Sequence, residues 1–173
     1  MRPVVDIIGD VVTAMSAKML ITPIADYTSV NYLYGTLEEM GGILAEWTKK
    51  PTVNKEQFPL ICLVQPFEED IKNKGYEVEV PLNVLILTDS KQEYKAADRY
   101  TYSFKPILYP LWDLFISRLR NSKEISPEIS EYKKTDHIDW GKLTPDGKPV
   151  TPFSDFLDGI ELKNLTVKIF KTN

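Results

Sequence analysis

Three apolar runs between residues 58 and 119 predict the centre of the fold. Residues 58–64 are almost continuously apolar, which is too short a run for a free-standing helix and typical of a buried strand. In residues 77–87 the even positions from 78 to 86 are apolar, whereas 77, 79 and 83 are polar, as in a half-buried strand. Residues 104–119 change to helical spacing with one apolar face. The pattern therefore predicts two strands and a helix that covers them.

The segment between these strands, residues 65–76, is longer than a tight turn and contains Gly75 near its end. We expect an exposed loop that joins the strands as an antiparallel hairpin. Its acidic residues, Glu68, Glu69 and Asp70, favour a solvated charge run over a metal site. Adjacent side chains point in different directions, and no histidine or further carboxylate has a matching spacing.

Apolar positions 4, 8, 11, 12, 15 and 19 recur at helical spacing, so we expect an N-terminal amphipathic helix over residues 3–21. Pro3 suits its first turn, and Pro23 lies just past its end. Many of its apolar residues are β-branched, which leaves a strand as the alternative and means that a helix here needs a partner surface. Residues 24–34 have weak periodicity and are interpreted as an extended connector.

A second helix is predicted from residue 36, because Thr36 and Glu39 match a capping box. Lys49-Lys50-Pro51 places positive charge at the carbonyl end of this helix and then stops it. The pair Gly41-Gly42 in its middle indicates either very close packing or a bend. The expected buried stripe consists of Leu37, Met40, Ile43, Leu44 and Trp47.

Residues 93–100 are compatible with a helix, and two prolines interrupt the pattern that follows. Pro106 and Pro110 lie four residues apart, and a proline inside a helix removes a hydrogen bond and clashes with the preceding turn. We therefore expect a kink between 104 and 110, with the best-formed helix over residues 106–120.

The last third of the chain, residues 124–173, has the pattern of a β-rich extension. A short strand is expected within 129–141, and Asp146-Gly147 and Asp158-Gly159 are interpreted as turn dipeptides around an irregular loop over 145–156. The final strand covers 160–170. Its two halves are out of phase by one residue, which predicts a bulge near Asn164.

These elements predict an α+β fold with a small, mainly antiparallel sheet packed by two to three helices. At 173 residues the chain fits a single domain over 1–173, with a core in 34–120. Its content of 43% hydrophobic and 27% charged residues is ordinary for a globular protein.

Charge and cysteine content exclude several classes of protein. The formal charge of −4 argues against a general nucleic-acid binder, which needs Lys and Arg to neutralise phosphates. The single cysteine, Cys62, allows no internal disulfide, and its apolar strand predicts a buried, inert thiol. Asp6 and Asp10 interrupt the N-terminal apolar residues, so no signal peptide is expected. No window provides the roughly eighteen uncharged apolar residues of a membrane span, so no membrane contact is expected.

Candidate chemistry is sparse. The single histidine, His137, lies close to Asp136 and Asp139, but a partly exposed strand histidine without a matched partner is favoured over a metal site or a proton relay. No glycine-rich loop followed by lysine supports phosphate binding, and no serine has the setting of a nucleophile. An aromatic run is assigned to core packing rather than to base stacking: Tyr94, Tyr100, Tyr102, Phe104, Tyr109 and Trp112. We expect no enzyme activity, no cofactor and no metal.

Four short segments between residues 34 and 120 carry a family resemblance. They are Tyr34-Gly35 before a helix, Phe58-Pro59-Leu60-Ile61 at a strand start, Leu87-Thr88-Asp89 at a strand end, and Arg99-Tyr100 followed by Phe104-Lys105-Pro106-Ile107-Leu108-Tyr109-Pro110. Together they resemble the small neck and tail proteins of tailed phages and prophages of gut bacteria. Within that group the chain is most similar to tail terminator or tail-completion proteins and to head-tail connector rings stacked beneath a portal. The shared motifs are packing motifs, not catalytic ones.

The resemblance implies a compact α+β subunit that forms a homo-oligomeric ring, six- or twelvefold, around the DNA channel in the neck or tail of the virion. Its partners would be copies of itself and the neighbouring portal, neck and tail proteins, and DNA would pass through it without sequence-specific binding. Assembly would take place in the bacterial host cytoplasm.

In such a ring, three parts of the chain are the expected inter-subunit or channel elements: the helix 3–21, the loop 65–76 and the extension 124–173. Glu68, Glu69 and Asp70 are candidates for the channel lining, because like charge discourages DNA from binding as it passes. One alternative is a small non-enzymatic adaptor or binding domain of a bacterial host. A weaker alternative is an enzyme that uses the acidic loop and His137.

Overall fold

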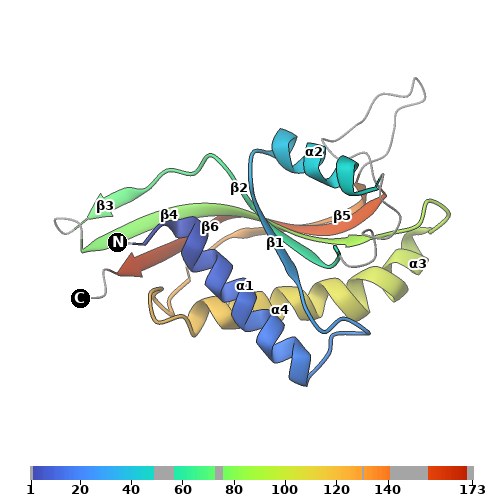
Figure 1. The fold of residues 1–173 in the computed structure, drawn as a ribbon, viewed down its shortest axis with the longest axis horizontal. Helices are drawn as coiled ribbons and strands as arrows, with labels where there is room; N and C mark the ends of the chain where they lie inside the picture. Colours follow the sequence, from blue (N-terminus) through green and yellow to red (C-terminus); the bar gives the residue numbers. More distant parts are fainter. Residues whose placement is uncertain (1, 49–56, 73–75, 130, 141–155, 171–173) are drawn as a thin grey trace.

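A six-stranded, mostly antiparallel sheet runs through the middle of the molecule, with helices on both of its faces (Figure 1). The computed structural model describes residues 2–48, 57–72, 76–129, 131–140 and 156–170. The arrangement confirms the α+β class predicted from the sequence.

The sheet has the strand order β1-β2-β4-β6-β5. In that order the strands are β1 (Asn31–Gly35), β2 (Leu60–Val64), β4 (Glu77–Asp89), β6 (Leu157–Phe170) and β5 (Lys133–Trp140). β1 is parallel to β2, and every other neighbouring pair is antiparallel. A short strand, β3 (Asp70–Lys72), pairs with β4 beyond the part of β4 that contacts β2.

The two central strands predicted from the sequence are confirmed as β2 and β4, and they pair in an antiparallel manner. Leu60 to Leu63 of β2 are completely buried. Cys62 lies among them as a free thiol, and burial raises the pKa of that thiol. The expectation of a buried cysteine is therefore confirmed.

The predicted bulge near Asn164 is confirmed in β6. Opposite β4 the register shifts between Leu82 and Val84, and Asn164 adopts a left-handed backbone with φ of 57°. The amide of Asn164 donates to Oδ1 of Asn83 at 3.2 Å. The extra residue brings both halves of β6 into phase with the same core, which contains Ile160, Leu162, Leu165, Val167 and Ile169.

The helices α1 and α4 cover one face of the sheet (Figure 1). The predicted N-terminal helix is α1 (Val4–Ile21), and it lies beside α4 on this face (Figure 1). It contributes seven buried side chains: Val4, Ile7, Ile8, Val11, Val12, Met15 and Met19. This partner surface outweighs the low helix propensity of its β-branched residues. The core is consequently not confined to residues 34–120, because α1 and β6 both contribute to it.

The opposite face is covered by α2 (Leu37–Thr48) (Figure 1). Its capping box is confirmed: the Glu39 amide donates to Thr36 Oγ1 at 3.2 Å, and the Thr36 amide donates to Glu39 Oε2 at 2.8 Å. These hydrogen bonds with Thr36 hold the pKa of the Glu39 carboxyl below its usual value. The predicted end of the helix at Lys49-Lys50-Pro51 lies outside the described residues.

The predicted buried stripe of α2 is only partly correct. Met40 and Leu44 are buried in a second, smaller core, but Leu37 is 38% exposed. Leu37 is the first residue of the helix. A Cβ at Gly42 would meet nothing within 4 Å, so close packing does not explain this glycine.

The third helical region is continuous from α3 (Ala96–Arg99) through the π-helical segment η3 (Tyr100–Leu108) to α4 (Tyr109–Arg120). The sequence instead predicted a best-formed helix that begins at Pro106. Pro106 lies inside η3. A π-helix pairs residues five apart, so a local change of winding accommodates the missing amide of proline without ending the helix.

Two strands of the sheet were not predicted. Residues 24–34 were expected to be an extended connector, but residues 31–34 belong to β1, whose residues are mostly half-buried and therefore show no clear alternation. The segment 65–76 was expected to be an exposed hairpin loop, but it includes β3, which is held by its pairing with Glu77 to Glu79. The short strand expected within 129–141 is confirmed as β5, whereas Asp146-Gly147 and most of the loop 145–156 lie outside the described residues.

The left-handed backbone at Asn164 gives a test of the bulge. Replacing Asn164 with valine should lower the free energy of unfolding by about 1–2 kcal/mol, because a branched Cβ strains this conformation. The Asn164→Gly variant is the control and should change stability little, because glycine adopts positive φ readily. Urea unfolding measures both. Equal losses in the two variants would contradict the role of the backbone conformation.

Candidate functional site

The three acidic residues singled out in the sequence lie on the surface, just before and at the start of β3. Glu68, Glu69 and Asp70 are all exposed. Asp70 lies 3.6 Å from the ammonium group of Lys72, which also pairs with Glu79. The acidic side chains therefore face solvent and neighbouring lysine, as the interpretation of a solvated charge run predicted.

His137 has a partner that the sequence did not reveal. Its Nε2 lies 2.8 Å from Oε2 of Glu161 on the adjacent strand β6. The expectation of a histidine without a matched partner is wrong, because Glu161 is 24 residues away in the chain and only strand pairing brings it close. Glu161 also lies 3.3 Å from Lys163.

The acidic loop and His137 lie at opposite ends of the sheet. Asp70 pairs with Glu79 of β4, whereas His137 is aligned through Gly159 with Leu87 of β4. Eight residues of strand separate these two levels, which corresponds to about 26 Å at roughly 3.3 Å per residue. The structure therefore does not bring together the residues that an enzyme using both would need.

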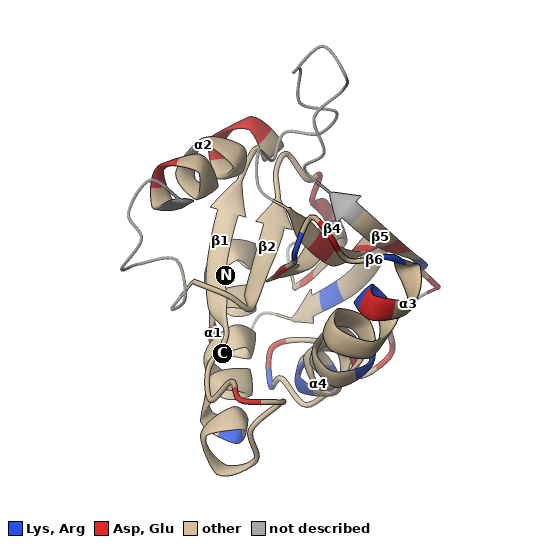
Figure 2. Ribbon diagram, turned by 90° about the vertical axis from the view of Figure 1, so that its right-hand side faces the viewer, with Lys and Arg blue, Asp and Glu red and all other residues tan. Residues whose placement is uncertain are grey.

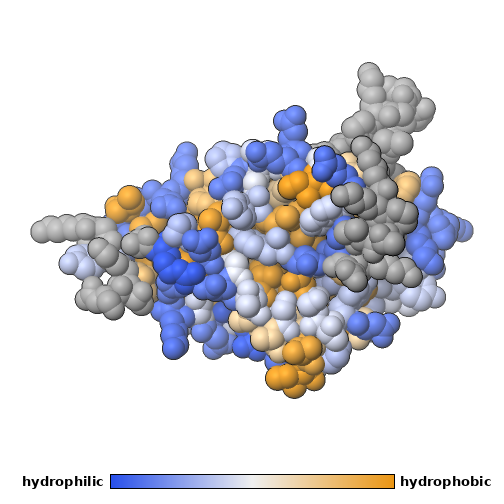
Figure 3. Space-filling model, in the orientation of Figure 1, coloured by the Kyte–Doolittle hydropathy of each residue, from blue (hydrophilic) through white to orange (hydrophobic). Residues whose placement is uncertain are grey.

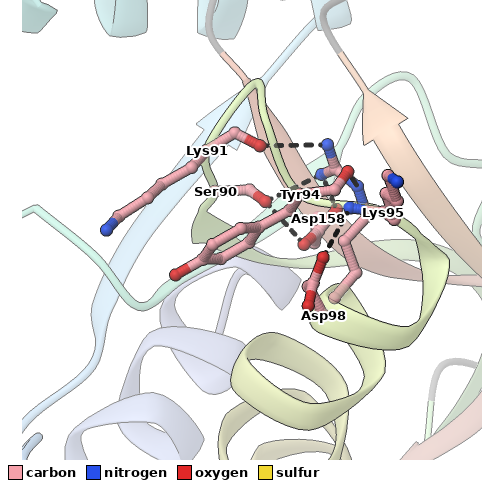
Figure 4. Close-up of polar contacts among 7 residues, drawn as sticks. Ser90, Lys91, Tyr94, Lys95, Asp98 and Asp158 are labelled. Carbon is pink, nitrogen blue, oxygen red and sulfur yellow. Dashed lines mark hydrogen bonds and ion pairs between the residues drawn. The ribbon is translucent and has the colours of Figure 1, made fainter.

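A buried polar cluster joins α3 to β6 (Figure 4). Arg99 is 1% exposed, and Asp158 is completely buried. Nη1 of Arg99 donates to Asp158 Oδ1 at 2.7 Å and to Ser90 Oγ at 2.8 Å. The Ser90 hydroxyl in turn donates to Asp158 Oδ2 at 2.7 Å.

The same guanidinium also holds the turn between β4 and α3. Nε of Arg99 donates to the Tyr94 carbonyl at 3.0 Å, and Nη2 donates to the Lys91 carbonyl at 3.1 Å. In Figure 4 the labelled residues from this turn surround Asp158. Charge-assisted hydrogen bonds of this kind are strong, and here they fix the start of the helix onto β6. Both charged groups are closed off from solvent, so the cluster suits a structural role.

This cluster corrects the interpretation of Asp158-Gly159 as a turn. Both residues lie inside β6, where Asp158 is opposite Thr88 and Gly159 is opposite Leu87. Aspartate followed by glycine has the local preference of a turn, but the ion pair with Arg99, 59 residues away, favours a buried strand position. Only the apolar residues around Asp158 signalled burial, and no sequence spacing identifies Arg99 as its partner.

Removing one member of the buried pair should be strongly destabilising. We expect Arg99→Met to lower the free energy of unfolding by about 3–5 kcal/mol, because the Asp158 carboxylate would lose its compensating charge. The double variant Arg99→Met with Asp158→Leu should be less destabilised than Arg99→Met alone. Denaturant unfolding measures both, and Arg120→Met on the exposed side of α4 is the control. A loss no larger than that of Arg120→Met would contradict this role.

Part of the aromatic run lies on the surface, contrary to the assignment of the whole run to the core. Tyr100 and Tyr102 are 53% and 56% exposed, and Tyr102 stacks on Tyr94 with 5.4 Å between the ring centres. Phe104 is buried as expected. The π-helical winding of η3 changes which positions face inward, and helical periodicity alone does not reveal it.

Tyr109 and Trp112 meet β5 through polar contacts. The Tyr109 hydroxyl donates to Oδ2 of Asp136 at 2.8 Å, and Nζ of Lys134 lies 4.8 Å from the Tyr109 ring centre and 5.1 Å from that of Trp112. The hydrogen bond with Asp136 is the main cause that raises the pKa of Tyr109 to about 12. These contacts place Lys134 and Asp136 on the face of the sheet that α4 covers.

The contact between Tyr109 and Asp136 should contribute stability that depends on pH. The pKa of Tyr109 rises on folding from 10.0 to about 12, so its contribution is complete below pH 10 and is lost as the pH rises towards 12. Tyr109→Phe should therefore lower stability at neutral pH and flatten the fall in stability across this alkaline range. Unfolding measured against pH tests this, with phenolate absorbance as the check on titration. An unchanged alkaline profile in Tyr109→Phe would contradict it.

Open grooves flank the edge strand β1 on both faces of the sheet. One groove, of about 570 Å³, lies beside α1, and Asp6 and Asp10 are among its polar lining residues. The other, of about 600 Å³, lies beside α2 and is lined by Glu39 and Glu46. Tyr34 lines both. Figure 2 shows the acidic residues of α2 next to the end of β1.

An apolar patch marks the free end of α1 (Figure 3). Leu20 and Ile21 are 73% and 80% exposed, more than any other large apolar residue that the structure describes. Apolar side chains presented at the tip of a helix suit contact with another molecule.

Within the described ranges, no group of three or more His, Cys, Asp and Glu side chains is arranged to hold a metal ion. In the same part of the chain, no helix is long and apolar enough to cross a membrane. A scan against models of protein families gave no match, and a search of curated proteins gave none either.

Proposed function

We propose that this chain is a non-enzymatic structural subunit of a tailed phage, which assembles into a homo-oligomeric ring at the neck or tail around the DNA channel. Tail termination and head-tail connection are the two roles that such a ring serves. The subunit works by shape and self-association, and it passes DNA without reading its sequence.

The observation that carries this proposal is the spatial grouping of the segments that resemble neck and tail proteins. Phe58 to Ile61 and Leu87 to Asp89 lie at paired ends of β2 and β4. The segment Arg99-Tyr100 and the segment 104–110 form the helix that packs beneath this sheet, and Tyr34-Gly35 ends the neighbouring strand β1. The resemblance therefore falls on one connected part of the fold.

Surface features support a role in assembly. The edge of β1 lies between two open grooves, and the tip of α1 presents Leu20 and Ile21 to solvent. Glu68, Glu69 and Asp70 form an exposed acidic segment at one end of the sheet, which suits a channel lining that repels passing DNA. The buried polar cluster around Arg99 stabilises the subunit from within.

Assembly of the purified protein tests the proposal. We expect light scattering to give a mass several times that of one chain, and negative-stain images to show closed rings. Neighbouring neck and tail proteins are added where the chain alone stays small. A chain that remains monomeric at all concentrations and does not bind those proteins would overturn the proposal and favour an adaptor domain of a bacterial host.

A further inference from the structure

We propose that the outer edge of β1 pairs with the outer edge of β5 in a second copy of the chain, so that neighbouring subunits share one continuous sheet. The inference deepens the proposed function and rests on it for one point, namely that the partner is another copy. β1 and β5 are the terminal strands of the sheet, and among the described residues no strand pairs with the outer edge of either.

The backbone groups of Tyr32 and Tyr34 point away from the sheet. In a parallel ladder each residue directs its amide and its carbonyl to the same side, and successive residues alternate. The amide of Asn31 and the carbonyl of Gly35 bond to the segment that contains β2, at 2.9 and 2.8 Å. Residues 31, 33 and 35 therefore face β2, and Tyr32 and Tyr34 direct their amides and carbonyls outward.

The same alternation fixes the outward residues of β5. The Ser90 amide donates to the Phe156 carbonyl at 2.9 Å, so even-numbered residues of β4 and of the first half of β6 face each other. Odd-numbered residues of β6 then face β5, and the residues opposite them in β5 are odd-numbered too. Lys134 and Asp136 are therefore the residues of β5 that direct their backbone groups outward.

The two outer edges lie at the same height in the sheet. The registers align five residues across it: Asn31, Leu60, Leu87, Gly159 and His137. When the two edges pair without a shift along the strands, Asn31 of one copy therefore lies opposite His137 of the next copy. Tyr32 then lies opposite Asp136, and Tyr34 lies opposite Lys134. These are the residues whose backbone groups face outward on each edge.

Strand direction and sheet face agree as well. β1 and β2 run in one direction, β4 runs against them, β6 runs with them, and β5 runs against them again. Rotation about a ring axis that lies along the strands preserves both direction and face, so β5 of one copy meets β1 of the next in an antiparallel join. Each opposed pair of outward residues then exchanges two backbone hydrogen bonds.

Charge complementarity favours a second copy of the chain as the partner of the β1 edge. Lys134 covers Tyr109 on the α4 side, so the alternation of side chains places Lys133 on the α2 side. Lys133 is exposed, and the join sets it opposite Gly35, at the groove that Glu39 and Glu46 line. Pairing between backbones supplies affinity, and a pocket for a side chain supplies specificity.

The sequence of β1 also lacks the usual protection of an exposed edge. Natural edge strands are commonly blocked by lysine, proline or inward-facing charge. β1 consists of Asn-Tyr-Leu-Tyr-Gly and contains none of these. An edge left open in this way is a template for another strand.

Amide hydrogen exchange on the assembled protein provides the first test. The amides of Tyr32, Tyr34, Lys134 and Asp136 should exchange at least about tenfold more slowly in the assembly than in dissociated subunits. The amides of Leu33 and Thr135 face inward and should be protected in both states, so they are internal controls. Unchanged exchange at Tyr32 and Tyr34 in rings would overturn the inference and leave the proposed function standing.

Charge reversal provides the second test. Lys133→Glu should weaken assembly about tenfold or more, because it places like charge beside Glu46. Adding Glu46→Lys to it should restore assembly, and Lys105→Glu on the exposed side of η3 is the control with the same change of charge. Sedimentation velocity measures the dissociation constants. Equal effects of Lys133→Glu and Lys105→Glu, or no rescue by Glu46→Lys, would count against the join.

Proline substitution tests the backbone directly. Tyr34→Pro removes an outward amide and should abolish assembly, whereas Tyr34→Ala keeps the amide and should assemble; circular dichroism checks that each folds. Where Tyr34→Pro does not fold, the charge-reversal series decides.

If the wild-type chain stays monomeric and also binds no neighbouring neck or tail protein, the proposed function fails, and the edge is tested alone with a synthetic peptide of residues 131–138. Protection of the Tyr32 and Tyr34 amides by this peptide would support the pairing. No protection at saturating peptide would overturn it.

Discussion

The fold depends on the long antiparallel pairing of β4 and β6. Their register extends from Glu77 opposite Phe170 to Asp89 opposite Leu157, with one bulge on the way. One face of this ribbon carries the large core shared with α1 and α4, and the other carries the small core beneath α2. β2 joins one side of the ribbon and β5 joins the other. β1 is positioned in turn by its pairing with β2, at one edge of the sheet.

This dependence explains which parts of the fold could be predicted from the sequence. Local periodicity, or contacts between residues a few positions apart, predicted four features: the central strands, the first helix, the capping box at Thr36 and the bulge at Asn164. β1 and β3 are short, and they are defined by the strands that they pair with. No local sequence pattern therefore predicts them. At Pro106 the sequence indicated that the helix is interrupted, but not how. The same residues are compatible with a break in the helix and with a local change of winding.

The polar residues, too, could be predicted only where their environment depends on the local sequence. Exposure of Glu68, Glu69 and Asp70 follows from adjacent charges in a polar segment, and the sequence was sufficient to predict it. The pairing of Arg99 with Asp158 was not predictable, because the turn preference of Asp158-Gly159 is local and the ion pair is not. The place of β1 at the edge of the sheet was likewise missed, because it depends on which strands stand beside it in the folded sheet.

The position of β6 between β4 and β5 has a consequence for biosynthesis. β6 follows both of these neighbours in the chain, yet it separates them in the sheet. While the ribosome is still producing the segment before residue 157, β5 has no strand to pair with, and the Arg99 guanidinium has no Asp158 carboxylate beside it. The β5 edge of the sheet and the buried ion pair between Arg99 and Asp158 therefore form only after β6 has been synthesised.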